Sequence, residues 1–201
     1  RDTLVRENHA VGTGTGSGGG IHLISTSAAM TNTVLIDNQV SYGAAGMAAV
    51  GAYVRMVHST VARNHGGDDS GIYLSLMNTG GPASVLMTDS ILVDHGVGIT
   101  ATAGTMGMTN TATLDGVLWY GNGTNTGGGG VIHVTNATTG DPAFAPDGYH
   151  LRPFSAAIDQ GVGPGGVADI DGDIRPIGPA VDLGADEAPR WIFLPLVMRN
   201  A

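Results

Sequence analysis

The sequence predicts an all-β fold, a β-solenoid of about five stacked coils, and two repeated phrases carry this prediction. The first phrase is a short polar residue, a small residue and an aliphatic residue, and it recurs at steps of 30, 27, 30 and 26 residues. The second phrase, a glycine followed by an aliphatic residue, runs in the same register. Self-similarity at this period is typical of stacked repeats. The first phrase begins at Asp2, Asn32, Ser59, Asp89 and Asp115, and the second at Gly20, Gly46, Gly71, Gly98 and Gly130.

The composition agrees with this fold class and excludes several function classes. The 201 residues include 34 glycines and no cysteine, so disulfides, thiol catalysis and cysteine zinc sites are excluded. The net charge of −9 makes nucleic acid and anionic membranes unexpected partners. The longest apolar run, residues 191–198, is far shorter than the roughly 20 residues of a membrane-spanning helix, so we expect no membrane span.

Residues 1–140 are expected to form the coils, because short alternating apolar patterns replace helical periodicity. Equivalent residues of adjacent coils would stack about 4.8 Å apart. An asparagine, or a histidine on one coil, follows the second strand of each coil and is expected to end it in a turn. These turn residues are Asn8, Asn38, Asn64, His95 and Asn122. One core column would contain Ile21, Met47, Ile72, Ile99 and Val131, and another Leu4, Val34, Val61, Ile91 and Val117.

Residues 141–188 follow a different pattern, dense in proline and glycine. We expect them to form an irregular cap over the last coil, since an uncapped solenoid exposes its core and its strand edges. Residues 189–201 would form an apolar terminal strand or tag.

Four motifs in this region carry a family resemblance. They are Asp-Pro-x-Phe at 141–144, Ser-Ala-Ala-Ile-Asp-x-Gly at 155–161, Asp-Ile-Asp-Gly-Asp-x-Arg-Pro at 169–176 and Asp-Leu-Gly-Ala-Asp-Glu at 182–187. The segment looks like the tail of choice-of-anchor-type surface proteins, and the coils resemble right-handed parallel β-helix repeat proteins of the bacterial cell surface. The resemblance implies an extracellular or cell-surface location and a right-handed coil, and it implies no known activity.

Candidate catalytic residues are few. The repeat places Asp89 and Asp115 in one column on adjacent coils, and they are the best carboxylate pair in the chain. We favour a turn role for this column and predict no catalytic residue, because Asn32 and Ser59 occupy it elsewhere. A module that binds or cleaves polysaccharide is the alternative, and its aromatic candidates are Tyr42, Tyr53, Tyr73, Trp119 and Tyr120.

Asp169, Asp171 and Asp173 are the candidate metal ligands. Alternate carboxylates on a glycine-containing loop offer the oxygen ligands that calcium prefers. In the competing interpretation these acids cap turns and pair with Arg175. No other cofactor is expected, and we interpret all seven histidines as surface or turn residues.

We therefore expect a non-catalytic extracellular structural protein, a surface scaffold or adhesin. Head-to-tail addition of the terminal strand to the open first coil of another copy would generate a filament. Self-association is thus the expected partnership, with polysaccharide as the alternative partner. The expected interface contains Leu4 and Val5 on one copy and Trp191, Ile192, Phe193, Leu194, Leu196 and Val197 on the other.

Overall fold

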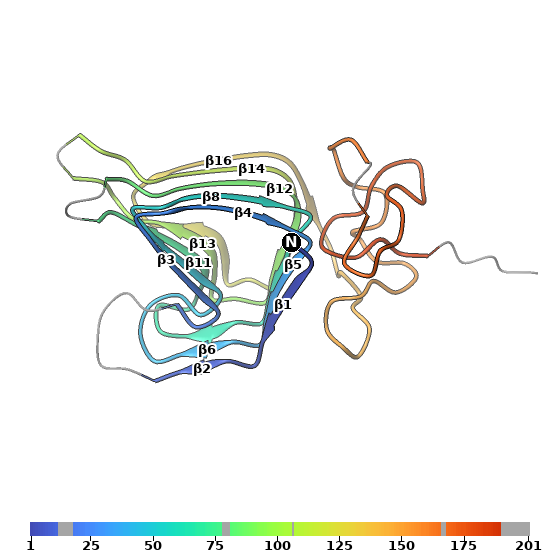
Figure 1. Ribbon diagram of the computed structural model, residues 1–201, viewed down its shortest axis with the longest axis horizontal. Helices are drawn as coiled ribbons and strands as arrows, with labels where there is room; N and C mark the ends of the chain where they lie inside the picture. The colour runs from blue at the N-terminus through green and yellow to red at the C-terminus, as the bar shows by residue number, and fades with distance from the viewer. Residues whose placement is uncertain (12–17, 78–80, 106, 166–167, 190–201) are drawn as a thin grey trace, which may run out of the picture.

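The computed structural model describes residues 1–11, 18–77, 81–105, 107–165 and 168–189, and the ordered elements among them are all strands (Figure 1). The strands pair in parallel and form three sheets, which face one another around a common interior. The prediction of an all-β, parallel β-solenoid is confirmed. The sheet with five strands spans about four turns, slightly fewer than the five coils expected.

The largest sheet has eight strands. These strands are β1 (Thr3–Arg6), β4 (Ser27–Thr31), β5 (Thr33–Ile36), β8 (Tyr53–Val57), β9 (Thr60–Ala62), β12 (Ser84–Val93), β14 (Thr111–Tyr120) and β16 (Val131–Thr139). The five-stranded sheet contains β3 (Ile21–Ile24), β7 (Met47–Val50), β11 (Ser70–Ser75), β13 (Val97–Ala101) and β15 (Thr124–Gly127). The three-stranded sheet contains β2 (His9–Ala10), β6 (Gln39–Val40) and β10 (His65–Gly66).

The eight-stranded sheet bends along one line, at a residue whose backbone is left-handed on every coil. This line explains the first sequence phrase, because asparagine, aspartate and glycine adopt positive φ most readily. It passes through Asp2, Asn32, His58, Asp89, Gly116 and Asn136, with φ between 47° and 67°.

The sequence phrase is displaced by one residue on two coils, because the bend lies at His58 and Gly116 rather than at Ser59 and Asp115. The predicted column that begins at Leu4 is therefore partly wrong. Ile91 pairs with Thr60, and its partner on β14 is Leu118. Since a slip of one residue moves a side chain to the other face, Val61 packs inside the solenoid.

The second predicted column is correct from Ile21 to Ile99 and wrong at its last member. Ile99 pairs with Thr126 of β15, and Val131 pairs with Thr111 in the eight-stranded sheet. The sequence Thr-Asn-Thr-Gly of β15 lacks the aliphatic residue that marks the other rungs, so the pattern skipped this strand.

A ladder of side chains runs along the solenoid at the turn after the bend. The side-chain Nδ2 of Asn38 donates a hydrogen bond to Asn64 Oδ1 (2.9 Å), and the backbone N–H of Asn38 donates to the same oxygen (3.0 Å). Each asparagine also donates to a carbonyl of the preceding coil, as Asn64 does to Leu35 (2.9 Å). The glycine of the second phrase is required here, because a Cβ at Gly46 would lie 3.1 Å from Asn64 Nδ2 and 2.4 Å from the Gly71 oxygen.

His95 occupies the fourth rung of this ladder and is buried. Its amide donates to Asn122 Oδ1 (3.0 Å), and its Nε2 contacts Asn64 Nδ2 (3.3 Å). Its Nδ1 is buried and contacts no hydrogen-bond partner among the described residues. His58 is also buried, and both histidines lie at bends, so they are turn residues that do not reach the surface.

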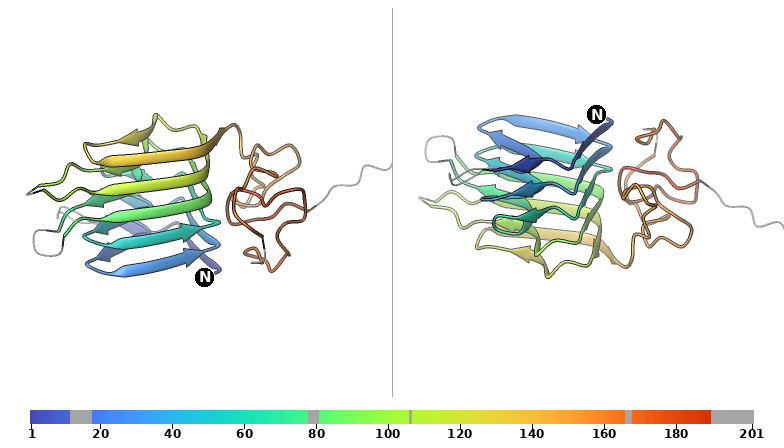
Figure 2. Two further views of the ribbon diagram at one scale, coloured as in Figure 1. Left: turned by 90° about the horizontal axis from the view of Figure 1, so that it is seen from above. Right: turned by 90° about the horizontal axis from the view of Figure 1, so that it is seen from below.

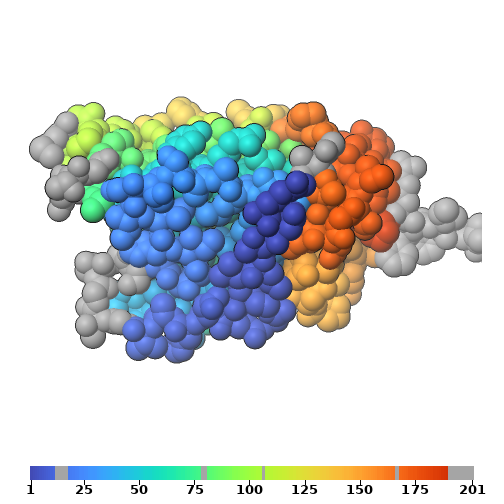
Figure 3. Space-filling model, viewed as in Figure 1, coloured from blue at the N-terminus to red at the C-terminus, as the bar shows by residue number. Residues whose placement is uncertain are grey.

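Residues 141–188 pack against the flank of the solenoid, whereas the sequence suggested that they cover its last coil (Figure 2). Their apolar side chains contact the outward faces of the strands after the bend, in one cluster that includes Val34, Ile91, Leu118 and Leu183. Figure 3 shows the same contact on the molecular surface, with this segment in orange and red. The last strand, β16, remains largely exposed as a result.

Candidate functional site

A groove of about 490 Å³ lies on the outer face of the five-stranded sheet. His22 of β3 and Tyr73 of β11 line its floor, and Tyr42 and Asp68 line it from the loops before β7 and β11. Tyr42 is half exposed. Two phenol rings beside an imidazole and a carboxylate offer stacking surfaces and hydrogen-bonding groups in one place.

The carboxylates suggested for catalysis do not share a column. Asp115 pairs with Thr88 and is hydrogen-bonded to Thr135 (2.7 Å), whereas Asp89 lies at the bend. The Asp89 carboxylate accepts hydrogen bonds from the amides of Val162 (2.7 Å) and Gly163 (2.9 Å). It therefore fastens the C-terminal segment to the solenoid, consistent with a turn role.

The Asp169 carboxylate accepts hydrogen bonds from the backbone of its own loop. Its Oδ1 accepts hydrogen bonds from the amides of Asp171 (2.9 Å) and Asp173 (2.8 Å), and its Oδ2 accepts one from Glu187 (2.9 Å). Among the described residues, the one group of side chains with metal-ligand spacing contains Asp171 but neither Asp169 nor Asp173. Calcium binding by the three acids stays a prediction.

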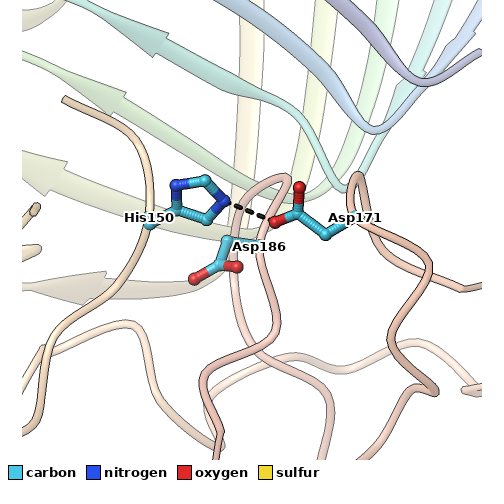
Figure 4. A group of neighbouring side chains, drawn as sticks. All are labelled: His150, Asp171 and Asp186. Carbon is cyan, nitrogen blue, oxygen red and sulfur yellow. Dashed lines mark hydrogen bonds and ion pairs between the residues drawn. The ribbon is translucent and has the colours of Figure 1, made fainter. Parts of the chain in front are cut away.

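The group that contains Asp171 also includes His150 and Asp186 (Figure 4). One ligand atom from each of the three side chains lies within 4.8 Å of the others. His150 Nε2 is hydrogen-bonded to Asp171 Oδ2, and His150 Nδ1 lies 2.6 Å from Asp147 Oδ2. Asp186 Oδ2 accepts a hydrogen bond from the Leu151 amide (2.7 Å).

Charge and burial shape the acid–base behaviour of this group. Burial opposes protonation of His150, but its hydrogen bonds to Asp147 and Asp171 raise its pKa to about 9. Burial raises the pKa of Asp186 to about 6. No pattern in the sequence indicates this group, because its members come from three separate loops and the histidine lies outside the acidic motifs.

The structure also gives Arg175 a partner other than the loop acids. Its Nη1 donates to Glu187 Oε2 (3.0 Å), and its Nη2 donates to the Gly184 oxygen (2.9 Å). Both charged side chains of this pair are buried. The motifs at 169–176 and 182–187, two of the four that carry the family resemblance, therefore meet in one polar core.

The expected assembly residues are only partly described. Leu4 is 42% exposed on β1, and Val5 packs against the interior core. Trp191, Ile192, Phe193, Leu194, Leu196 and Val197 lie outside the described residues. None of the residues that the structure describes forms a helix long and apolar enough to cross a bilayer.

Comparison of the chain with protein-family models, with curated proteins and with solved structures finds no match.

Proposed function

We propose that the protein is a non-catalytic structural protein, a surface scaffold whose solenoid joins end to end with other copies. The observation that carries this proposal is the composition of the edge strands. At one end of the stack, β16 contains no charged residue and no proline. The same is true of β3 and β4 at the other end, where the edge strand β1 carries a single charge, at Arg6. Soluble proteins commonly place charges or proline on such edges to prevent pairing.

A second copy of this chain suits these edges because a parallel solenoid repeats by translation. The last coil offers unpaired backbone groups in the arrangement that the first coil of another copy would continue. Val131 and Val134 are exposed on β16, and Leu4 and Ile24 are exposed on β1 and β3. Such a contact is head-to-tail and does not close, so it generates a filament. We include in this proposal the extracellular location that the family resemblance implies.

The test is the association state of the purified chain over a range of concentrations, by light scattering and electron microscopy. We expect elongated assemblies, and Val134→Lys should give monomers because it places a charge in the contact. Tyr53→Lys adds the same charge to an exposed position on β8, which pairs with a strand on each side, and this variant should assemble normally. A wild-type monomer at every concentration, or unchanged assembly of Val134→Lys, contradicts the proposal.

Polysaccharide binding is a second candidate, and the groove beside β3, β7 and β11 favours it. Tyr42 and Tyr73 could stack against sugar rings while His22 and Asp68 accept or donate hydrogen bonds to hydroxyl groups. Binding to a panel of cell-surface polysaccharides should weaken in Tyr42→Ala. Tyr53→Ala, an equally exposed tyrosine outside the groove, should bind as the wild type does. Equal loss in both variants, or none in either, contradicts a specific site.

A further inference from the structure

Three carboxylates surround one imidazole in the C-terminal segment. Asp147, Asp171 and Asp186 lie around His150, so the group carries a net negative charge even when the imidazole is protonated. Asp186 is 4% exposed. Only its Oδ2 accepts a hydrogen bond from the described residues. Buried carboxylates are costly unless a cation or hydrogen-bond donors compensate them, and this group has a deficit of positive charge.

His150 is oriented as metal-binding histidines usually are. Its Nδ1 faces Asp147 at 2.6 Å, so its Nε2 is directed toward Asp171 and Asp186. A carboxylate on the far nitrogen fixes the ring and increases the basicity of the ligating nitrogen. The Asp147 side chain is itself fixed in place, because its Oδ1 accepts hydrogen bonds from the backbone N–H groups of Tyr149 and His150, both at 3.2 Å.

We propose that His150, Asp171 and Asp186 bind one divalent transition-metal ion of the zinc class, with Asp147 as the positioning residue. One imidazole and two carboxylates suit zinc, which takes nitrogen and oxygen ligands at about 2.0–2.2 Å. Calcium fits less well, because it prefers six to eight oxygen ligands. Three protein ligands leave the fourth position to water.

The ion would require only a small contraction of the group. Ligand atoms bonded to zinc at about 2.0–2.1 Å in a tetrahedron are roughly 3.4 Å apart. The present atoms lie within 4.8 Å of one another, and Asp171 is half exposed and has room to adjust. The ion would replace the hydrogen bond between His150 and Asp171 and join three loops of a segment in which the described residues contain no strand.

The test uses the whole chain after removal of bound metals with a chelator. Calorimetric titration with Zn²⁺ should show one equivalent, and Co²⁺ should give the visible absorption of a tetrahedral site. The melting temperature should rise by roughly 5–10 °C at free zinc about 100 times the dissociation constant. Asp171→Asn and His150→Gln should each weaken zinc binding about 10-fold or more.

His133→Gln is the matched control, because His133 is an exposed histidine on β16 outside the group. It should bind zinc as the wild type does. Circular dichroism verifies folding, and Asp171→Asn keeps the test valid if His150→Gln unfolds, since the Asp171 side chain is half exposed. The proposal is overturned if the wild type binds no stoichiometric zinc, if both variants bind it unchanged, or if Ca²⁺ binds in preference to Zn²⁺.

Discussion

Replacing His95 by asparagine should stabilise the protein, because it completes the ladder that Asn38, Asn64 and Asn122 form on other coils. The side chain of His95 reaches Asn64 through Nε2 and leaves Nδ1 buried without a partner among the described residues. An asparagine there would offer Oδ1 to Asn64. It would also direct Nδ2 toward a carbonyl of the preceding coil, as Asn122 does toward Leu92 (2.9 Å).

The expected gain follows from the hydrogen bonds. Relieving an unsatisfied buried nitrogen is worth about 1–3 kcal/mol, and each new hydrogen bond adds roughly 0.5–1.5 kcal/mol. Loss of the ring where it packs against Gly71 offsets part of this gain, because the smaller side chain leaves a small cavity. We therefore expect the free energy of unfolding to rise by about 1–2 kcal/mol at pH 7, or roughly 2–4 °C in melting temperature for each kcal/mol.

The difference in the free energy of unfolding between His95→Asn and the wild type should increase at acidic pH. Burial lowers the pKa of His95 to about 4, below the ordinary value of 6.5, with Asp69 and Arg63 as the facing charges. The unfolded chain therefore binds the proton first, and the wild type loses stability as the pH falls from about 6.5 toward 4. The variant lacks this loss, so the gap should widen by about 2 kcal/mol between pH 7 and pH 5.

The assay is urea unfolding at pH 7 and pH 5, followed by circular dichroism, for the wild type, His95→Asn and His95→Ala. Other titrating groups, including His58, Asp182 and Asp186, cancel in the difference between proteins. The alanine variant separates removal of the imidazole from completion of the ladder, and it should be less stable than the asparagine variant at both pH values. A His95→Asn protein less stable than the wild type at pH 7, or a gap that stays constant in acid, would refute the ladder argument.

Three further substitutions test contacts that the fold depends on. Glu187→Gln leaves the Arg175 charge buried without its partner and should reduce the free energy of unfolding by about 3–5 kcal/mol in urea titrations. Asp89→Ala removes the acceptor of two amides of the C-terminal segment. Hydrogen exchange should therefore accelerate in residues 162–163 before it does in the strands. Gly46→Ala places a Cβ 2.4 Å from the Gly71 oxygen and should lower the melting temperature by several degrees.

The sequence predicted the coils because each one repeats a left-handed bend and a ladder turn that few residue types satisfy. Asp2, Asn32 and Asp89 mark the bend as expected. The register failed at His58 and Gly116, since neither belongs to the short polar class, although both accept positive φ at this site. A pattern defined by the backbone conformation, rather than by polarity, would have aligned these coils correctly.

The position of the C-terminal segment and the group around His150 could not be predicted in the same way. Their contacts join residues without any periodic relation, such as the Leu151 amide and Asp186, 35 positions apart. The apolar residues that hold the segment, including Leu151 and Leu183, are few and irregularly spaced. The motifs identified the segment as distinctive, but they did not indicate which face of the solenoid it covers.

The side position of this segment changes what the solenoid can do. Since residues 141–188 cover the flank, they hide the apolar outward side chains of the strands after the bend and leave the edge of β16 open. The buried carboxylates of Asp89, Asp169 and Glu187 accept hydrogen bonds from backbone N–H groups of this segment. In the part of the chain that the structure describes, these N–H groups pair with no strand. Polar contacts thus replace strand pairing in fixing the segment. The segment blocks lateral association through the face that it covers. The exposed ends of the stack are where we propose that a second copy adds.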